Sequence, residues 1–573
     1  RQLTNYSHVS IAILTLYRTV NQIQISNSWC GVAMVFGWLC VLLCLCQTNA
    51  KPNIVLIIAD DLGWNDIGFH GSNELRTPNI DALASSGLSL HNYYVAPICT
   101  PSRASLMTGK YGIHTGMQHG VIYGMEPRGL PLSETILPQY LKKEGYSTHL
   151  VGKWHLGSYK KKYLPLNRGF DSHLGFWTGK IDMYDHTTEE KGVWGFDFRR
   201  GFAVAHDLFG KYATDVYTEE AVKIIKSHNT LNPLFLMLAH SAVHTGNPYE
   251  PIRAPEPRVA EFEHIQDPQR RKFAAVVSKM DESVGAIVQS LQARGMLQDT
   301  IILFSTDNGG PAAGFNSNAA SNYPLRGVKN TLWEGGVRGV GILWSPLLAK
   351  IPRVATQRIH IVDWLPTLLT AAGVNVSSLL QLDGLDQWAT LSNDLKSQRS
   401  TVLHNIDDIF GSASLTVDQW KIHVGTNYNG AWDGWYGPEE RKGTYNVESV
   451  VNSTAAKAIQ QLKLMPNPQT IIELRDASKV MCGNVEPISC KPLISPCLFN
   501  IEQDPCERRN LASLESEVLN RLLEELDKLN RTAVPPNNKE IDSRGDPKYW
   551  GRTFTNFGDY THPTTTCSTD CSL

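Results

Sequence analysis

Short, continuous apolar runs recur along the chain and constrain its fold more than any other feature. They are rich in β-branched residues and do not alternate with polar residues, which is typical of strands buried on both faces of a parallel sheet. The runs are NIVLIIAD at 53–60, THLVGKWH at 148–155, PLFLMLAH at 233–240 and TIILFSTDNGG at 300–310. Helical patterns such as LPQYLKKEG and AAVVSKMDESVGAIVQSLQARG separate them. This order predicts an α/β fold in which helices cover both faces of one large sheet.

The pattern changes near residue 400. The stretch SLTVDQWKIHVGT alternates like a half-exposed antiparallel strand, and cysteines concentrate after residue 480. A chain of 573 residues can form a large domain with a smaller companion. We predict a large domain at 51–397, a smaller C-terminal domain built on an antiparallel sheet at 398–560, and a tail at 561–573.

An apolar run near the N-terminus predicts secretion. Residues 34–50, MVFGWLCVLLCLCQTNA, read as a signal peptide cleaved near Ala50, after a leader of unclear status at 1–33. An uncleaved anchor is the alternative, although the apolar run is short for a membrane span. Sequons at Asn375, Asn452 and Asn530 fit the same route. We expect a lysosomal or extracellular protein with no stable membrane insertion after cleavage.

Six late cysteines are expected to form disulfides in that oxidising compartment. They are Cys482, Cys490, Cys497, Cys506, Cys567 and Cys571. Cys497 and Cys506 flank the turn-like segment LFNIEQDP, and we predict that they pair. Such a short closed loop contributes roughly 2–3 kcal/mol of stability.

The charge balance argues against nucleic acid as a partner. The chain has 53 Lys and Arg against 55 Asp and Glu, a net charge of −2. We find no basic stripe of the kind that binds a phosphate backbone.

Polar residues cluster where the predicted strands end. Because ligands of open α/β sheets bind beyond the carboxyl ends of strands, these segments are expected to meet in one crevice. The candidates are Asp60, Asp61, Lys153, His155, His244, Asp307 and Asn308.

The acidic candidates suggest a metal and the basic ones an anion. Asp60, Asp61, Asp307 and Asn308 offer hard oxygen ligands suited to Ca²⁺ or Mg²⁺. The alternative is that DD and DN are ordinary turn formers. Together, the basic residues would hold an oxyanion. The alternative is that each of them is an ordinary side chain on the protein surface. These basic residues are Arg103, Lys153, His155, His244 and Lys329.

Cys99 stands far from every other cysteine. Pro101 follows it, which favours the first turn of a helix, where free N–H groups attract anions. These features alone allow a nucleophilic thiol of low pKa. A thiol protease would need a His/Asn arrangement that we do not find, and would not need a carboxylate metal site.

Several motifs together resemble the sulfatase family. CTPSRASLMTG at 99–109 resembles its signature C-x-P-S-R, and GKWHLG resembles its second signature. IIADDLGWND, STDNGG and PLRGVKNTLWEGGVRG resemble its metal and substrate segments. The resemblance runs from about residue 52 to at least 390, continues more weakly through LFNIEQDPCERRNLA, and points to the arylsulfatase B-like branch of animal sulfatases. It implies an alkaline-phosphatase-like fold and sulfate-ester hydrolysis.

The resemblance also implies a role for each candidate. A formylglycine-generating enzyme would oxidise Cys99 to Cα-formylglycine, whose hydrate attacks sulfur. Ca²⁺ would be held by Asp60, Asp61, Asp307, Asn308 and the group derived from Cys99. Arg103 would support the hydrate and His155 would be the base. Lys153 and Lys329 would bind sulfate oxygens, and His244 would assist the leaving group.

Substrate identity is the least defined part of the prediction. The family often has a small hydroxyl residue where Lys180 falls, so Lys180 is expected to contact substrate at the rim. Tyr184, Trp177 and Tyr249 are expected to stack on a sugar. The expected substrate is a glycosaminoglycan sugar of the N-acetylgalactosamine 4-sulfate type, with small aryl or plant-derived sulfate conjugates as the alternative.

Two other classes remain open. A phosphatase or phosphodiesterase of the related fold would use Ser or Thr and two zinc ions with more His ligands, against which Cys99 and the oxygen-only set argue. An inactive homologue that only binds sulfated glycans would have no reason to retain the whole set.

Overall fold

The computed structural model describes residues 51–379 and 381–561. The predicted leader at 1–33, the predicted signal peptide at 34–50 and the tail cysteines Cys567 and Cys571 lie outside the described residues. Within the described ranges no helix is long and apolar enough to cross a membrane. The domain boundary between 397 and 398 stays a prediction.

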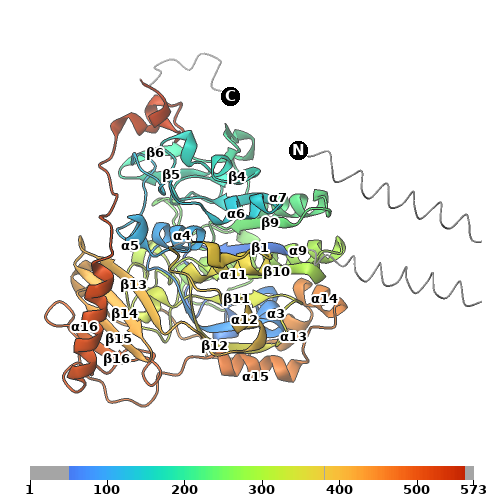
Figure 1. Cartoon of the computed structure of the whole chain (residues 1–573). Helices are drawn as coiled ribbons and strands as arrows, with labels where there is room; N and C mark the ends of the chain where they lie inside the picture. Colours follow the sequence, from blue (N-terminus) through green and yellow to red (C-terminus); the bar gives the residue numbers. More distant parts are fainter. Residues whose placement is uncertain (1–50, 380, 562–573) are drawn as a thin grey trace, which may run out of the picture. The chain divides into compact units, whose positions relative to one another are not determined.

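One ten-stranded mixed sheet organises the chain from Lys51 onward (Figure 1). Its centre is parallel, since β1 pairs with β9 and β10, and β3 pairs with β9 and β4 in the same direction. Antiparallel pairs flank that centre. In spatial order the strands are β12 (Arg353–His360), β2 (Leu88–Tyr94), β11 (Gly341–Trp344), β10 (Thr300–Thr306), β1 (Asn53–Ala59), β9 (Leu234–Ala239), β3 (Ser147–Lys153), β4 (Ser172–Phe176), β7 (Arg199–Arg200) and β8 (Ala203–Val204). The α/β prediction with a large mixed sheet is confirmed.

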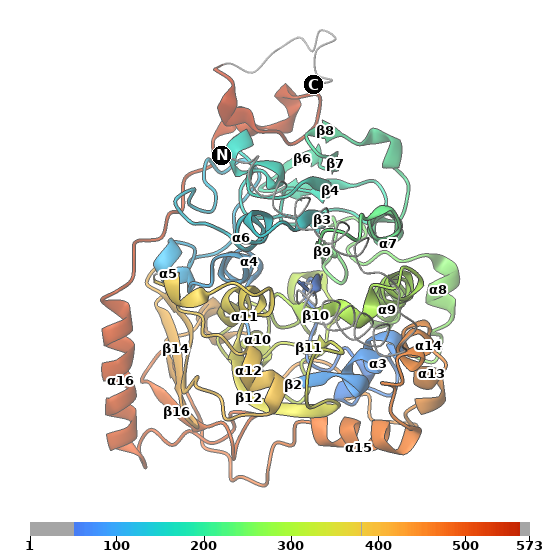
Figure 2. The same cartoon turned by 45° about the vertical axis from the view of Figure 1, so that its right-hand side comes forward.

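Helices cover both faces of this sheet because successive side chains of the central strands point in opposite directions. Val55 and Ile57 of β1 belong to one buried core, whereas Ile54, Leu56 and Ile58 belong to another. Burying each such side chain contributes about 1.5–3 kcal/mol. Figure 2 shows the two groups of helices on opposite sides of the strands. The first core contains α3 (Pro78–Ser86), α7 (Ala213–Ser227) and α9 (Pro268–Ala293), and the second contains α4 (Cys99–Thr108), α6 (Leu137–Lys143) and α11 (Trp364–Ala371).

A second, four-stranded antiparallel sheet lies in the C-terminal part, as predicted. Its strands are β13 (Thr401–Asp407), β14 (Ser412–Val417), β15 (Trp420–Val424) and β16 (Cys497–Asn500). The segment SLTVDQWKIHVGT is not one strand, because the chain turns at Asp418, whose φ of 50° is left-handed, and forms the β14–β15 hairpin. The amphipathic helix α16 (Ser516–Asn530) buries Leu522 and Leu526 against this sheet.

Shorter elements complete the chain. The β5–β6 hairpin spans Thr187–Glu190 and Val193–Phe196. The remaining α-helices are α5 (Gly112–Thr115), α8 (Glu256–Ala260), α10 (Glu334–Val337), α12 (Trp388–Asn393), α13 (Val447–Val451), α14 (Thr454–Gln461) and α15 (Pro468–Ser478).

The predicted Cys497–Cys506 disulfide is wrong. Cys482 pairs with Cys506 and Cys490 pairs with Cys497, with Cα–Cα distances of 5.2 and 5.8 Å that suit a disulfide. The two predicted partners face different cores. Cys497 begins β16 and packs with the group around Trp333, whereas Cys506 packs with the group around Trp64.

Candidate active site

The predicted polar residues meet at the carboxyl ends of β3, β9, β1 and β10, which are four consecutive strands of the sheet. Asp60 follows β1, Asp307 follows β10 and Lys153 ends β3. Parallel pairing brings these strand ends level, since Ala59 pairs with Thr306 and Ala239 pairs with Gly152. The strand ends therefore form the crevice that the sequence predicts.

Four oxygen-bearing side chains form the acidic half of the site. Asp60, Asp61, Asp307 and Asn308 are all buried, with exposed fractions of 0 to 1%. Asn308 Nδ2 donates to Asp61 Oδ1 at 2.7 Å, and the Asp61 amide lies 3.3 Å from Asp307 Oδ1. Asp61 has a left-handed backbone, with φ of 70°, which is uncommon outside glycine and frequent at functional sites. The set is thus held in one place by hydrogen bonds among its own members.

Each carboxylate has a buried cation beside it. Lys153 Nζ lies 2.6 Å from Asp60 Oδ2, Lys329 Nζ lies 2.7 Å from Asp61 Oδ1, and Arg103 Nη2 lies 2.9 Å from Asp307 Oδ2. Three carboxylates therefore face three cations. Because the ion pairs balance one another, a divalent cation added here would give the site a net positive charge suited to an anionic substrate.

The donors include a group able to hold a metal ion. One ligand atom from each of Asp60, Asp61, Cys99 and His244 lies within 4.8 Å of the others. Asn308 Oδ1 is buried and has no hydrogen-bond partner among the described residues. A buried oxygen without a donor costs free energy unless a cation or water occupies the space in front of it. The oxygen atoms of Asp60, Asp61 and Asn308 suit a hard cation such as Ca²⁺, whereas the predicted ligand Asp307 is not part of the four-residue group.

The carboxylates do not titrate alike. Burial alone would raise the pKa of Asp61, but the neighbouring His244 and Lys329 outweigh it and lower that pKa. Burial and the negative charge of Asp60 raise the pKa of Asp307 despite Arg103. Lys329 is held charged, because Asp61 more than offsets the effect of burial and raises its pKa.

Cys99 is the first residue of α4, as the Pro101 argument predicts. It is buried, its Sγ lies 3.6 Å from Asp60 Oδ1, and it is the cysteine left outside a disulfide among the described residues. Burial raises the pKa of its thiol to about 12, although Lys153 and Lys329 act in the other direction. The alternative of a thiol with low pKa is therefore wrong, since an unmodified Cys99 is protonated at neutral pH.

His155 is poised as a neutral base. Its Nε2 lies 3.1 Å from the Ile122 carbonyl oxygen, which can only accept, so Nε2 carries the proton. Burial together with Lys153 and Arg103 lowers its pKa well below the ordinary value. In this neutral tautomer Nδ1 has the free lone pair, and within the described residues Nδ1 has no hydrogen-bond partner. His155 also has a left-handed φ of 57°.

His244 is bound between its own loop and Lys329. Its Nδ1 donates to the Thr245 carbonyl at 2.7 Å, so Nε2 is the acceptor that faces Lys329 Nζ at 3.2 Å. Asp61 Oδ2 lies 3.4 Å from the same Nε2. Burial lowers the pKa of His244 to about 3, against the opposing effect of Asp61. The proton of this pair therefore sits on Lys329.

Lys180 is half-buried next to the cluster. Burial and the charge of Lys329 lower its pKa, while Glu189 and Glu190 raise it. Gly179 brings this loop close to His155, because a Cβ at position 179 would lie 3.0 Å from Nε2 of the ring. Lys180 is thus near enough to Lys329 for their charges to interact.

Glu190 is a buried site residue that the sequence does not reveal. Its carboxylate accepts from the amides of Gly124 at 2.6 Å and Gly179 at 3.2 Å, which joins the two loops on either side of His155. Burial raises its pKa to about 7. The sequence signal is absent, because Glu190 ends the polar segment TTEE of β5, which reads as an exposed edge.

The predicted sugar-stacking residues divide into two groups. Trp177 is wrong for that role, since it is 2% exposed and lies beneath the Arg199 guanidinium, 4.3 Å from the ring centre. Tyr249 is 53% exposed and stacks on Trp194, and Tyr184 lies against Arg253. For these two tyrosines the predicted contact with substrate stays a prediction.

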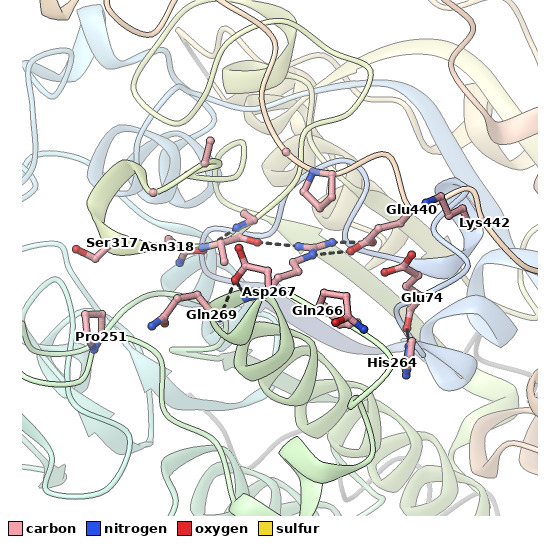
Figure 3. A pocket seen from close by; sticks show the side chains of 18 residues that line it. Glu74, Pro251, His264, Gln266, Asp267, Gln269, Ser317, Asn318, Glu440 and Lys442 are labelled. Atoms are coloured by element: carbon pink, nitrogen blue, oxygen red, sulfur yellow. Dashed lines mark hydrogen bonds and ion pairs between the residues drawn. The ribbon is translucent and has the colours of Figure 1, made fainter.

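A pocket of about 960 Å³ lies beside the site but shares none of its ionic residues. Figure 3 shows Glu440, Lys442 and Glu74 on one side of it and Pro251, Ser317 and Asn318 on the other. Arg270 and Glu440 line the pocket, and together with Asp66 they form what we call the Arg270 cluster. Asn318 links the pocket wall to the active site, because its side-chain amide donates to the Val243 carbonyl next to His244.

Comparisons with known proteins agree with this geometry. Arylsulfatase J of Mus musculus is 39% identical over 517 residues, covering 88% of this chain and 80% of that protein. N-acetylgalactosamine-6-sulfatase of Homo sapiens is 31% identical over 408 residues, covering 67% of this chain and 73% of that protein. The crystal structure of Ps i-CgsB in complex with k-i-k-neocarrahexaose has a TM-score of 0.65 at 25% identity, covering 86% of this chain and 95% of that one.

A family model described as Sulfatase matches residues 52–374, more than half of the chain. This segment contains all the buried carboxylates and cations of the crevice, from Asp60 to Lys329, together with Cys99 at the start of α4. Motifs, geometry and relatives converge, and the chain belongs to the sulfatase family.

Proposed function

We propose that this sulfuric ester hydrolase removes sulfate from sugars of the N-acetylgalactosamine 4-sulfate type, using bound Ca²⁺ and a formylglycine made from Cys99. The observation that carries the proposal is the buried Cys99 thiol 3.6 Å from Asp60, inside a cluster of three carboxylates and three cations. A thiol held protonated there is a poor nucleophile, so conversion of Cys99 to another group would explain why a cysteine lies at this position.

Calcium would be held by Asp60, Asp61, Asp307, Asn308 and the group derived from Cys99. The unpartnered Asn308 Oδ1 and the proximity of Asp60, Asp61 and position 99 support this assignment. When bound, the ion would supply Lewis-acid polarisation of a sulfate oxygen. The formylglycine hydrate would supply an oxygen nucleophile at position 99, and a formylglycine-generating enzyme is the partner required during maturation.

The cations would bind and orient the sulfate ester. Lys153 and Lys329 carry ammonium groups inside the cluster and would hold sulfate oxygens, which places the negative charge of the substrate among fixed donors. Arg103 is anchored on Asp307 through Nε at 3.0 Å and would support the group at position 99, its neighbour one helical turn away.

The two histidines would handle protons at defined atoms. His155 Nδ1 would accept a proton, since that nitrogen has the free lone pair and Nε2 is committed to Ile122. His244 Nε2 accepts from Lys329, so the pair would deliver a proton to the oxygen of the departing alcohol from the Lys329 side. These roles follow from the tautomers that the two carbonyl contacts require.

The substrate class is supported by the relatives and by the rim. One relative is an N-acetylgalactosamine-6-sulfatase, and Ps i-CgsB is seen in complex with k-i-k-neocarrahexaose. Lys180, beside Lys329, would meet a second anionic group such as a uronate carboxylate. Hydrolysis of small aryl or plant-derived sulfate conjugates is the alternative, and an inactive glycan-binding homologue is the remaining one. The secretory route, ending in the lysosome or outside the cell, belongs to the same proposal.

Two measurements test the proposal. Mass spectrometry of the peptide that contains Cys99 should find formylglycine after expression with a formylglycine-generating enzyme. Kinetics should then show turnover of a small aryl sulfate and of a chain ending in 4-sulfated N-acetylgalactosamine. Unmodified Cys99 with no turnover would favour the inactive homologue. Good aryl turnover without any action on the sulfated sugar would remove the glycan assignment and leave the sulfatase assignment standing.

A further inference from the structure

A loop from the C-terminal sheet region reaches the catalytic cluster. We use this name for the partly buried His244 together with the buried residues Asp60, Asp61, Cys99, Arg103, Lys153, His155, Asp307, Asn308 and Lys329. The loop follows β15 and contains Asn427 and Tyr428. Asn427 Nδ2 donates to the carbonyl of Asn330 at 2.6 Å, and the Asn330 side-chain amide donates to the Tyr428 hydroxyl, also at 2.6 Å. Asn330 directly follows Lys329 and has a left-handed φ of 62°. Chain segments about a hundred residues apart are thus joined next to the sulfate-binding lysine.

Contacts hold the hydroxyl and one edge of the ring of Tyr428, while part of the side chain stays exposed. The side chain is 44% exposed, although its hydroxyl is fixed by Asn330. Its ring packs edge-on against Phe315, with ring centres 5.4 Å apart, and Phe315 packs in the same way on Trp432 at 5.0 Å. A bulky residue with a left-handed φ of 55° needs such fixing, because this backbone conformation is unfavourable for tyrosine.

The charges around this ring include Lys329 of the active site. Burial raises the pKa of Tyr428, whereas the Asn330 hydrogen bond and the positive charge of Lys329 lower it, and Tyr123 raises it slightly further. Tyr428 is therefore close to Lys329 and also to Tyr123, which precedes the Gly124 contact of Glu190. Lys191 lies 4.5 Å from the centre of the Tyr123 ring. Tyr428 is thus tied to Asn330, the residue next to Lys329, while part of its side chain stays exposed.

We propose that Tyr428 is a specificity-determining residue that contacts the sugar bearing the sulfate, with its ring stacked on the apolar face of a pyranose. This inference rests on the proposed glycan-sulfatase function. Aromatic rings are large, rigid contact surfaces with little conformational entropy to lose, and the C–H face of a pyranose is their usual counterpart. Fixing the hydroxyl on Asn330 holds the ring ready before the substrate arrives.

The competing role for Tyr428 is to position Lys329 through Asn330. The two roles use different atoms of the same side chain, because stacking needs the ring and positioning needs the hydroxyl. Tyr428→Phe keeps the ring and removes the hydroxyl, whereas Tyr428→Ala removes both. Tyr549, which is 37% exposed on a 3-10 turn outside the site, provides the matched control Tyr549→Ala.

The test measures a small aryl sulfate as substrate and a disaccharide ending in 4-sulfated N-acetylgalactosamine as competitive inhibitor. We expect Tyr428→Ala to raise the inhibition constant about 3- to 10-fold. Tyr428→Phe and Tyr549→Ala should leave it within about two-fold of the parent value, and kcat for the aryl sulfate should be unchanged in all three.

Each contrary outcome has a distinct meaning. An unchanged inhibition constant in Tyr428→Ala, with inhibition in the parent, overturns the sugar contact alone. An inhibition constant that rises as much in Tyr428→Phe as in Tyr428→Ala assigns the effect to the hydroxyl and the positioning of Lys329, and overturns the stacking of the ring on the sugar. Absence of inhibition in the parent at millimolar disaccharide contradicts the proposed glycan function and removes the basis of this contact with it.

Discussion

The catalytic cluster and the Arg270 cluster are both buried groups of carboxylates and cations, but their hydrogen bonds differ. Arg270 uses Nε and Nη2 on the two oxygens of Glu440, at 2.7 and 2.8 Å, and Nη1 on Asp66 at 2.7 Å. The other Asp66 oxygen accepts from the amides of Gly63 and Ser321. By contrast, Asn308 Oδ1 and His155 Nδ1 of the catalytic cluster have no partner among the described residues.

This difference separates a structural ion network from a site built for ligands. A buried network is stable when every member is satisfied, and the Arg270 cluster joins α9 to the loop after β1 and to Glu440 in this way. The catalytic cluster keeps free acceptors and balanced ion pairs, so it gains stability only when a cation or an anion arrives. We therefore expect substitutions in the catalytic cluster to lower activity, and substitutions in the Arg270 cluster to lower stability.

Replacing Cys99 should give the largest loss of activity. Cys99→Ser replaces the thiol that maturation is proposed to oxidise, and an unmodified serine that accepted sulfate would have no second hydroxyl to expel it, so we expect kcat/KM for an aryl sulfate to fall at least ~10³-fold. Cys99 is a small residue at a helix start, so the melting temperature should change by less than about 2 °C. Enzyme kinetics and a thermal melt at matched protein concentration measure the two effects. Near-normal turnover by Cys99→Ser would contradict the role of the modified cysteine.

The same substitution in each cluster makes the sharpest comparison. Arg103→Met should lower kcat/KM about 10²-fold or more, because it removes a cation beside position 99. Arg270→Met leaves two buried carboxylates without their cation and should cost about 3–5 kcal/mol of stability, while kcat/KM per folded molecule stays within about three-fold. Chemical denaturation and active-fraction kinetics check both. Equal losses of activity in the two variants would show that the clusters do not differ in function.

Removing the metal should affect the catalytic cluster alone. A calcium chelator should lower aryl-sulfate turnover at least ~10-fold, and added Ca²⁺ should restore it. Calcium at 100 times its dissociation constant should stabilise the folded protein by about 2.7 kcal/mol. Arg103→Met should alter this calcium-dependent gain, whereas Arg270→Met should leave it as it is. Full activity after exhaustive chelation and metal analysis would contradict the calcium assignment.

Buried carboxylates and buried histidines should change the stability of the protein in opposite directions as pH falls. Burial raises the pKa of Asp66 and Asp81 to about 6 and that of Asp281 and Glu190 to about 7. The folded state therefore binds these protons more tightly than the unfolded chain, so the contribution of these carboxylates to stability falls as pH rises from about 4 through 7. Burial also lowers the pKa of His70 and His240 to about 3, so the contribution of such histidines falls as pH drops below about 6.5. Because more buried histidines than carboxylates are shifted among the described residues, we expect a lower melting temperature at pH 5 than at pH 8.

The matched variant for this effect is Asp281→Asn. Asp281 accepts from the amides of Asn79 and Ile80 at the start of α3, and asparagine retains one such acceptor. Compared with the parent, the variant should lower the stability at pH 5 relative to pH 8 by roughly 1 kcal/mol, because it removes a carboxyl group that is protonated at pH 5 only in the folded state. A variant with the same pH dependence of stability as the parent would contradict the raised pKa of Asp281.

The sequence predicts the central strands and the catalytic cluster well because both depend on local patterns. The run NIVLIIAD predicts a strand at 53–60, and β1 spans Asn53–Ala59. Asp60 and Asp307 fall into one crevice because parallel strands end at one edge. The disulfides could not be predicted from spacing, since Cys497 and Cys506 face different cores.

The rim was the least predictable part because it depends on contacts between distant segments. Trp177 reads as an exposed aromatic in a loop but is buried under Arg199, which nothing in the local sequence indicates. Glu190 and Tyr428 reach the site from a polar edge strand and from the loop after β15. Their roles depend on partners more than sixty residues away, namely Gly124 and Asn330.

Replacing Lys180 should give the smallest effect and tests the rim. Lys180 lies close enough to Lys329 for their charges to interact, yet it makes no ion pair with the catalytic carboxylates. Lys180→Ser should therefore leave kcat for an aryl sulfate nearly unchanged. For a sulfated sugar followed by a uronate, kcat/KM should fall about 3- to 10-fold, the size of a partly exposed ion pair together with its hydrogen bonds.

Ionic strength and a substrate without a uronate distinguish a contact of Lys180 at the rim from a contact with the sulfate. If Lys180 meets a second anion, the difference between parent and Lys180→Ser should shrink as ionic strength rises, because a partly exposed charge pair is screened. It should also vanish with a sulfated monosaccharide that has no uronate. Equal losses on the aryl sulfate and the uronate-linked sugar would place Lys180 at the sulfate itself. The cluster would then hold a fourth cation against three carboxylates, and its charge balance before calcium binding would already favour the anion.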